Sequence, residues 1–286
     1  MAEPALAPAP NHELLARYHS DGFLVVPGLF PEATRARALA EIARTFRLRA
    51  ASLGLNPPGG QGQGAFSELL AGLFARDVPA YIAAAKLTQN LACVHQIGVS
   101  AELMGVVEAL GLSLPAISTR PVIHYMADRL KIPGGYQKTP PHQDWRSVQG
   151  SLDGITVWTP LYDVGLNDYP LEIVPGSHLS GLLDSTPDLP NYRVREELYS
   201  EADFRPLELM AGDAVVFSGF LLHRTGESGG DQVRVSLSYR FNNAAEPHFV
   251  RRGYPDRYLY RPDPAIVTAD FPSEAELAEV FPEAAR

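Results

Sequence analysis

The chain has 286 residues, of which 45% are hydrophobic and 20% charged, and its formal net charge is -9. This composition supplies a core and excludes a wholly disordered chain. The negative charge argues against nucleic acid as the main partner, because phosphate binding needs a basic surface. No apolar run reaches the length of a membrane span. The single Cys93 leaves no internal disulfide and no cysteine-based zinc site.

The ends and the domain organisation follow from composition and pattern. Residues 1–10 are mostly Ala and Pro and are expected to form a disordered arm. They have neither the basic start nor the apolar centre of a secretory signal, which favours a cytoplasmic location and no membrane partner. A single domain is predicted over 11–286, with a helical part (11–115), a β core (116–245) and a tail (246–286).

Helical patterns dominate the first part of the chain. A short helix over 11–19 and a buried strand over 23–26 precede a helix that opens at Pro31, since proline suits a first helical position. Residues 55–64 are rich in Gly, Pro and Gln and are predicted to form a flexible loop that could act as a lid. Three further helices are expected over 66–76, 78–90 and 100–110, the last with Ser100 as its N-cap.

The pattern changes near Ile117 to short β-prone stretches separated by Pro and Gly. A long polar insertion over 181–203 interrupts them. Many short strands with turns between them are typical of a sandwich or jelly roll with added helices. The expected strands are 121–126, 154–161, 171–174, 206–210, 214–217, 221–224 and 233–241.

His142 and Asp144 form the motif on which the functional prediction depends. On an extended strand, residues i and i+2 point the same way, so both side chains could hold one ion. A second imidazole, from His223, would complete the two-histidine, one-carboxylate triad that leaves open positions on non-haem Fe(II). The structural alternative is an ion pair between His142 and Asp144 at the end of a strand.

Arg234 follows His223 by eleven residues, with a turn-like segment between them. The two residues can therefore lie on adjacent antiparallel strands and share a cavity. The planar guanidinium of arginine meets a carboxylate with two parallel hydrogen bonds, which suits the far carboxylate of 2-oxoglutarate. A structural ion pair with Glu208 or Asp213 is the alternative for Arg234.

Several motifs occur in an order that resembles the phytanoyl-CoA dioxygenase family of Fe(II)/2-oxoglutarate oxygenases. The resemblance runs from about Tyr18 to about Phe241. The motifs are Asp21-Gly22-Phe23, His142-Gln143-Asp144, Trp158, Pro175-Gly176-Ser177-His178, Gly212-Asp213, His223 and Arg234. The resemblance implies a double-stranded β-helix (a jelly roll, as in cupins) flanked by N-terminal helices.

The resemblance also implies roles for individual residues. His142, Asp144 and His223 would ligate iron, and Arg234 would bind the 5-carboxylate of 2-oxoglutarate. Strand alternation adds Ser236 as a neighbour that assists Arg234. Further co-substrate neighbours implied by the family are Thr225, Trp158 and Met126. Trp158 is equally open to interpretation as a plain core residue.

Three polar residues are predicted to meet the substrate. Gln137 and Arg146 flank the metal motif, although Arg146 could equally form a surface ion pair. Alternation along the last strand places Arg240 on the same face as Arg234, and Tyr239 on the other. The loops that would shape the pocket vary freely between proteins, so the sequence does not identify the substrate. A free polar metabolite is favoured.

The reaction implied by the resemblance oxidises an unactivated C–H bond with Fe(II), 2-oxoglutarate and O2, and releases succinate and CO2. Family members that halogenate lack the carboxylate ligand, so Asp144 favours hydroxylation or a related oxidation. The alternative from another class is a cupin-like metal protein that binds or isomerises a sugar-like ligand without oxygen. Arg234 separates the two hypotheses, because only the oxygenase needs a carboxylate partner at that spacing.

Overall fold

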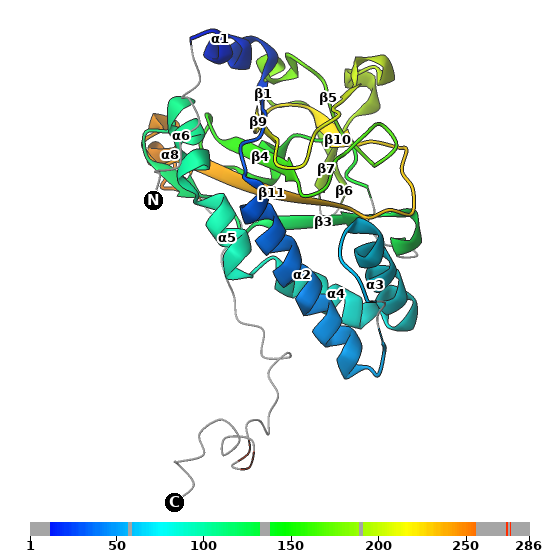
Figure 1. The fold of residues 1–286 in the computed structure, drawn as a ribbon. Helices are drawn as coiled ribbons and strands as arrows, with labels where there is room; N and C mark the ends of the chain where they lie inside the picture. Colours follow the sequence, from blue (N-terminus) through cyan, green and yellow to red (C-terminus); the bar gives the residue numbers. More distant parts are fainter. Residues whose placement is uncertain are drawn as a thin grey trace, which may run out of the picture.

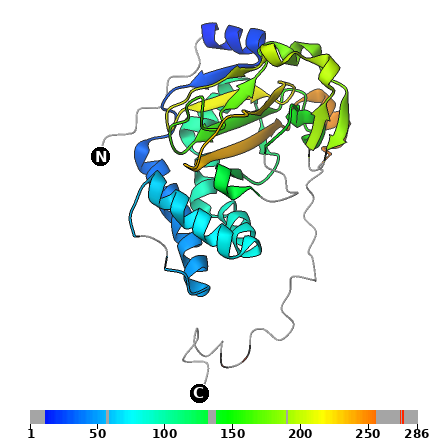
Figure 2. The ribbon, with the colours of Figure 1, turned by 90° about the vertical axis from the view of Figure 1, so that its right-hand side faces the viewer.

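The structure is a computed structural model that describes residues 12–56, 59–131, 138–188 and 191–255, together with residues 273 and 275. The predicted arm 1–10, Gln137 and most of the predicted tail lie outside the described residues. The helices between residues 32 and 98 pack on one side of the strands, and the first helix, at residues 12–21, lies at the opposite end (Figures 1 and 2). The expected fold class, a jelly-roll core with added helices, is confirmed by this arrangement and by the similar structures reported below. The division into a single domain stays a prediction.

The helices begin and end largely where the sequence predicts. Asp77 caps α4 by accepting a hydrogen bond from the backbone N–H of Ala80 at 2.8 Å, and Ser100 caps α6 in the same way, as predicted. Among the described residues, no single helix is long and apolar enough to cross a membrane; one bent pair, Val78–Thr88 with Ala92–Ala109, meets that test jointly, with a bend of 47°. The helices are α1 (His12–Asp21), α2 (Glu32–Ser52), α3 (Gln63–Arg76), α4 (Val78–Thr88), α5 (Ala92–Gly98), α6 (Ala101–Ala109), α7 (Asp144–Val148) and α8 (Pro247–Arg251).

The strands form two antiparallel sheets and a separate hairpin. The larger sheet has the order β1-β9-β4-β11-β2, with β3 also paired to β11, and the smaller has the order β10-β5-β8. Strands β6 and β7 pair with each other and with no other strand in the described residues. The strands are β1 (Phe23–Val26), β2 (Pro115–Ile117), β3 (Val122–Met126), β4 (Ile155–Pro160), β5 (Leu171–Ile173), β6 (Ser185–Asp188), β7 (Asn191–Val194), β8 (Arg205–Pro206), β9 (Ala214–Ser218), β10 (His223–Thr225) and β11 (Arg234–Asn243).

Strand β11 separates the hydrophobic core from the functional site. Its odd-numbered residues from 235 to 241 are buried in the core that the helices share with the larger sheet. The even-numbered residues Arg234, Ser238 and Arg240 face a cavity on the opposite side. This alternation is the one expected of a strand, and Tyr239 lies on the helix side as predicted. A register shift of one residue would exchange the core face for the site.

The observed local structure differs from the prediction in three places. The polar insertion 181–203 contains the β6–β7 hairpin, whose polar strands show no apolar alternation. Helix α5 was not predicted, because it has only seven residues and its N-cap position, Leu91, offers no capping side chain. The stretch predicted as a strand over 206–210 pairs at Pro206 and in one isolated bridge at Leu209.

Candidate metal and co-substrate site

Two segments far apart in the chain meet at the histidines. The backbones of His142 and His223 exchange both hydrogen bonds of an antiparallel pair, at 3.0 and 3.1 Å. Cross-strand partners project their side chains to the same side, so this pairing brings the two imidazoles together. Their ring centroids lie 4.1 Å apart.

Asp144 reaches the histidines by a different route from the one predicted. It is the first residue of α7, not part of an extended strand, so the alternation argument for residues i and i+2 is wrong in its mechanism. The turn into the helix places the carboxylate beside the imidazole: Oδ1 of Asp144 lies 3.4 Å from Nε2 of His142. The carboxylate is 4% exposed and accepts a hydrogen bond from Oγ1 of Thr156 at 2.6 Å.

Backbone carbonyl groups fix the tautomers of both histidines. Nδ1 of His142 lies 2.9 Å from the carbonyl oxygen of Pro140, and Nδ1 of His223 lies 2.9 Å from that of Leu221. A carbonyl oxygen can only accept, so each Nδ1 carries the proton and donates it, leaving the Nε2 lone pair for a ligand. Burial lowers the pKa of His223 to about 3, which keeps this imidazole neutral at neutral pH.

These three residues fit a divalent metal ion. One ligand atom from each of His142, Asp144 and His223 lies within 4.8 Å of the others, and all three residues are buried. Two neutral imidazoles and one carboxylate are the donor set of non-haem Fe(II) centres with open positions. The structural alternative, a simple ion pair of His142 with Asp144, does not account for the third buried donor.

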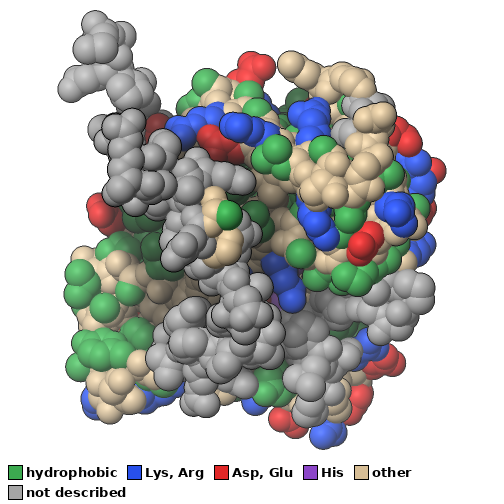
Figure 3. Space-filling model, turned by 90° about the horizontal axis from the view of Figure 1, so that it is seen from below, with side chains coloured by type: hydrophobic (Ala, Val, Ile, Leu, Met, Phe, Trp, Pro, Cys, Tyr) green, Lys and Arg blue, Asp and Glu red, His purple; other side chains and the backbone are tan. Residues whose placement is uncertain are grey.

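A cavity of about 360 Å³ opens beside these donors. Seen from below, the molecule is hollowed near the centre of this face, where basic side chains lie next to a histidine (Figure 3). Apolar side chains of Trp158, Leu171 and Phe217 form part of the wall. The ring of Phe217 meets that of His223 edge-on at 4.7 Å, so it supports the imidazole as well as excluding water.

Arg234 is a buried cation whose charge nothing in the described part of the chain balances. It is 3% exposed and lines the cavity. Its Nη1 donates to the carbonyl oxygen of Tyr169, while its Nε has no hydrogen-bond partner in the part of the chain that the structure describes. Burial lowers the pKa of Arg234 to about 9. A buried guanidinium without a carboxylate is costly, so its place in the cavity fits a carboxylate ligand from outside the chain.

One of the two alternative ion-pair partners of Arg234, Asp213, is occupied elsewhere. The two carboxylate oxygens of Asp213 accept hydrogen bonds from the backbone N–H groups of Gly28 and Met210, both at 2.8 Å. They hold the turn at Gly212, where φ is +95° and a Cβ atom would lie 2.6 Å from the carbonyl oxygen of Phe30. The Gly212-Asp213 motif is therefore a structural turn.

Comparison with known proteins identifies the family. The family model named phytanoyl-CoA dioxygenase (PhyH) matches residues 18–236. The chain belongs to the phytanoyl-CoA dioxygenase family. This membership confirms the resemblance predicted from the motifs. Phytanoyl-CoA dioxygenase 1 of Oryza sativa subsp. japonica is 28% identical over 155 residues, which are 49% of this chain and 53% of the rice protein. The alignment thus spans about half the length of that relative.

Solved structures share the fold at low sequence identity. The epimerase SnoN, in complex with Fe3+, alpha-ketoglutarate and nogalamycin RO, aligns with a TM-score of 0.57 at 20% identity, covering 88% of this chain and 91% of SnoN. EctD from S. alaskensis, with 2-oxoglutarate and 5-hydroxyectoine, aligns with a TM-score of 0.53 at 14% identity, covering 86% and 80%. The apo form of the non-haem monooxygenase ThoJ aligns at 0.55 and 19% identity, covering 80% and 77%.

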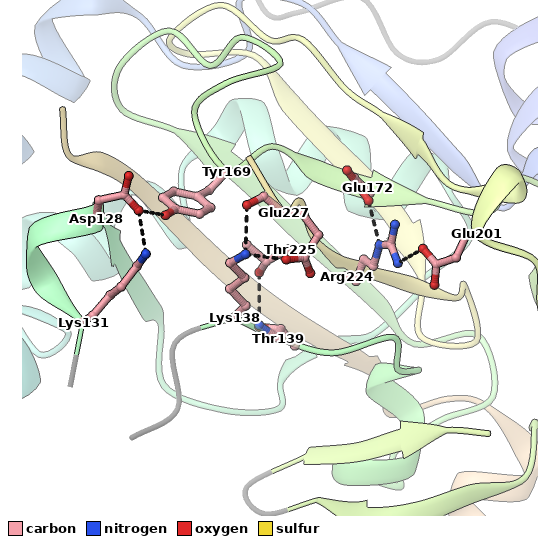
Figure 4. Close-up of polar contacts among 10 residues, drawn as sticks. All are labelled: Asp128, Lys131, Lys138, Thr139, Tyr169, Glu172, Glu201, Arg224, Thr225 and Glu227. Carbon is pink, nitrogen blue, oxygen red and sulfur yellow. Dashed lines mark hydrogen bonds and ion pairs between the residues drawn. The ribbon is translucent and has the colours of Figure 1, made fainter. Parts of the chain in front are cut away.

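Only some of the residues predicted to neighbour the co-substrate line this cavity. Thr225 and Trp158 line the cavity, and the Trp158 ring lies 5.4 Å from the Arg234 guanidinium carbon. The hydroxyl of Thr225 accepts a hydrogen bond from the backbone N–H of Thr139 at 3.2 Å (Figure 4). Met126 pairs across the sheet with Arg234 but lines a neighbouring cavity of about 220 Å³. Ser236 is fully buried and lines neither cavity, and its hydroxyl has no hydrogen-bond partner among the described residues.

The residues predicted to meet substrate have other contacts. Nη2 of Arg146 donates to the carbonyl oxygen of Leu183 at 2.8 Å, so this side chain ties α7 to the segment before β6. Arg240 lines the cavity as predicted. Its guanidinium, however, contacts Asp144 with two hydrogen bonds, from Nε to Oδ2 at 2.9 Å and from Nη2 to Oδ1 at 3.0 Å.

The contacts that hold the carboxylate of Asp144 in place were not predicted from the sequence. Burial alone would raise the pKa of Asp144, but the charge of Arg240 holds that pKa well below its usual range. Thr156, on β4, pairs in register with Arg240 on β11, so one strand pair presents both groups to the carboxylate. The only sequence signal for Arg240 is its shared face with Arg234.

Replacing Arg240 by glutamine is expected to lower the free energy of unfolding of the metal-free protein by about 3 kcal/mol, because it leaves a buried carboxylate without its cation. Mn(II) should then raise the Tm of the variant more than that of the wild type, since the metal ion supplies the missing positive charge. Thermal unfolding with and without Mn(II) measures both effects. Arg76→Gln, at an exposed position at the end of α3, is the control. If Mn(II) raises the Tm of Arg240→Gln and of the wild type equally, the contact between Arg240 and Asp144 is contradicted.

Proposed function

We propose that the chain is an Fe(II)/2-oxoglutarate-dependent dioxygenase that hydroxylates, or otherwise oxidises, an unactivated C–H bond of a small-molecule metabolite. In the hydroxylation, 2-oxoglutarate, O2 and the substrate C–H give succinate, CO2 and the alcohol. Membership of the family supports this proposal. A cytoplasmic location and the absence of a nucleic-acid partner remain predictions from composition.

The unbalanced charge of Arg234 is the observation that carries the proposal. A metal site alone would suit many proteins, but a buried guanidinium in the same cavity needs an anion. The carboxylate of 2-oxoglutarate far from its 2-oxo acid end meets this need with two parallel hydrogen bonds. The Trp158 ring lies against the same guanidinium, so the wall of the cavity is apolar at this point.

Other residues of the site would bind the metal, orient the imidazoles and limit the access of water. His142, Asp144 and His223 would hold Fe(II), which with 2-oxoglutarate and O2 supplies the oxidising chemistry. The Nδ1–H groups of both imidazoles stay bonded to backbone carbonyls and keep the rings in place. Trp158, Leu171 and Phe217 limit the access of water to the reacting C–H bond.

The cupin-like alternative, which uses no oxygen, offers no role for the buried Arg234 and does not accord with the family. Among oxygenases the type of oxidation is less constrained, because the similar structures include one described as an epimerase and one complexed with a hydroxylated compound. Asp144 supplies the carboxylate that favours hydroxylation over halogenation.

Succinate formation tests the proposal. Wild-type protein with Fe(II), 2-oxoglutarate and air is expected to form succinate across a panel of small polar metabolites, with at least one metabolite raising the rate above the uncoupled background. The His142→Ala variant should form none above a protein-free blank. If the wild type matches His142→Ala for every metabolite and consumes no O2, the cupin-like alternative is preferred.

A further inference from the structure

The cavity has a polar end that the proposed reaction does not use. Arg240 lies six residues beyond Arg234 on β11, which is about 20 Å along a strand. The backbone N–H of Ser118 donates to the carbonyl oxygen of Arg240 at 2.9 Å, which places the segment before β3 beside that end. Thr119 and Arg120, from this segment, line the cavity, and so does Ser147 on α7.

The arginines that line the cavity differ in how their charge is balanced. Arg224 is 2.7 Å from a carboxylate oxygen of Glu172 and also pairs with Glu201, so its charge is satisfied within the chain (Figure 4). Arg240 is paired with Asp144, the one acidic residue among the lining residues. The exposed Arg120 guanidinium has no ion-pair or hydrogen-bond partner among the residues that the structure describes.

Metal and co-substrate leave this end of the cavity positive. The charges of Fe(II) and the 2-oxoglutarate dianion cancel each other. Of the two arginines of β11 that line the cavity, Arg234 and Arg240, Asp144 is paired with Arg240 and balances one charge. One positive charge remains from that pair, and Arg120 adds another. A neutral substrate would leave both uncompensated in a partly enclosed cavity, whereas an anionic one would be attracted into it.

We infer that the site takes a substrate bearing a compact anionic group, a carboxylate or a phosphate, which binds Arg120 at the end of the cavity opposite Arg234. This inference rests on the proposed function, because it assumes that 2-oxoglutarate occupies Arg234. The hydroxyl of Ser147 is a further donor for the same group. The anion fixes one end of the substrate, and the C–H bond to be oxidised lies between it and the metal donors.

Sulfate is the probe for the first test. The full chain is loaded with Mn(II) and 2-oxoglutarate, and sodium sulfate is titrated calorimetrically at constant ionic strength. We expect one saturable site per chain, weakened about tenfold or more by Arg120→Gln, the loss expected when a charge-assisted hydrogen bond is removed. Arg120→Lys should recover part of the affinity, and the surface control Arg76→Gln should retain all of it.

The outcomes separate this inference from the proposed function. The affinity for 2-oxoglutarate is measured first in the same samples, and Arg120→Gln should leave it unchanged. If the wild type binds 2-oxoglutarate but shows no saturable sulfate site, or if Arg120→Gln binds sulfate as well as the wild type, the anion site is wrong and the oxygenase stands. If 2-oxoglutarate does not bind the metal-loaded wild type, both proposals fall.

Matched substrate pairs distinguish the two kinds of anion. Carboxylic acids are compared with their methyl esters, and phosphate monoesters with the parent alcohols, by their stimulation of 2-oxoglutarate turnover. Only the anionic member of a pair should stimulate, and Arg120→Gln should raise its KM without changing the KM for 2-oxoglutarate. Equal stimulation by acid and ester, and by phosphate and alcohol, would overturn the inference.

Discussion

Arg234→Met should raise the KM for 2-oxoglutarate by about 10- to 100-fold, the range that corresponds to the loss of a charge-assisted hydrogen bond or a bidentate pair. The affinity for Mn(II) should change by less than about twofold, since Arg234 is not one of the three donors. Steady-state turnover and metal titration of the same preparations measure the two quantities. Parallel loss of 2-oxoglutarate and metal binding would contradict the assigned role.

The same variant also separates a ligand-binding arginine from a structural one. Methionine removes a buried cation that has no acidic partner in the described chain, so the Tm of the ligand-free protein should not fall. Arg224→Met is the matched contrast, because its side chain is paired with Glu172 and Glu201. It should lower the Tm and leave the KM for 2-oxoglutarate nearly unchanged. A large loss of stability in Arg234→Met would show that the chain itself holds a hidden partner.

The fold and the metal donors could be predicted because each shows as a pattern of residues close together in the sequence. Short strands with Pro and Gly between them predict a jelly roll, and alternation along β11 correctly separates Arg234 and Arg240 from Tyr239. The His142–Asp144 spacing predicts the convergence of the two side chains. It does so for the wrong reason, since a helix start and not a strand turns Asp144 toward the imidazole.

The support of the site could not be predicted, because it depends on pairings between distant segments. The contact of Arg240 with Asp144 spans 96 residues and exists only because β4 and β11 pair in one register. Met126 shows the converse. Its position opposite Arg234 agrees with the family motif, yet its side chain lines the neighbouring cavity. A sequence motif predicts the strand on which a residue lies, but the packing of the strands determines which cavity its side chain lines.

His223→Ala should weaken metal binding by more than about 100-fold, a loss larger than that usual for removing a group that only orients a metal ligand. The backbone bridge between residues 142 and 223 does not need the imidazole, so the fold should persist. His124→Asn is the matched control, because His124 also lines the cavity but lies outside the donor set.

Titration with Mn(II) and the iron content of purified protein measure the effect of both variants. Burial lowers the pKa of His124 to about 3, so this imidazole, like that of His223, is neutral at neutral pH. A change of charge therefore cannot explain a difference between the two variants. If His223→Ala loses metal and His124→Asn does not, His223 is a metal ligand and His124 is not. Equal metal retention in both would mean that residues 142 and 144 bind the ion without the distal histidine, and the proposed iron centre would be wrong.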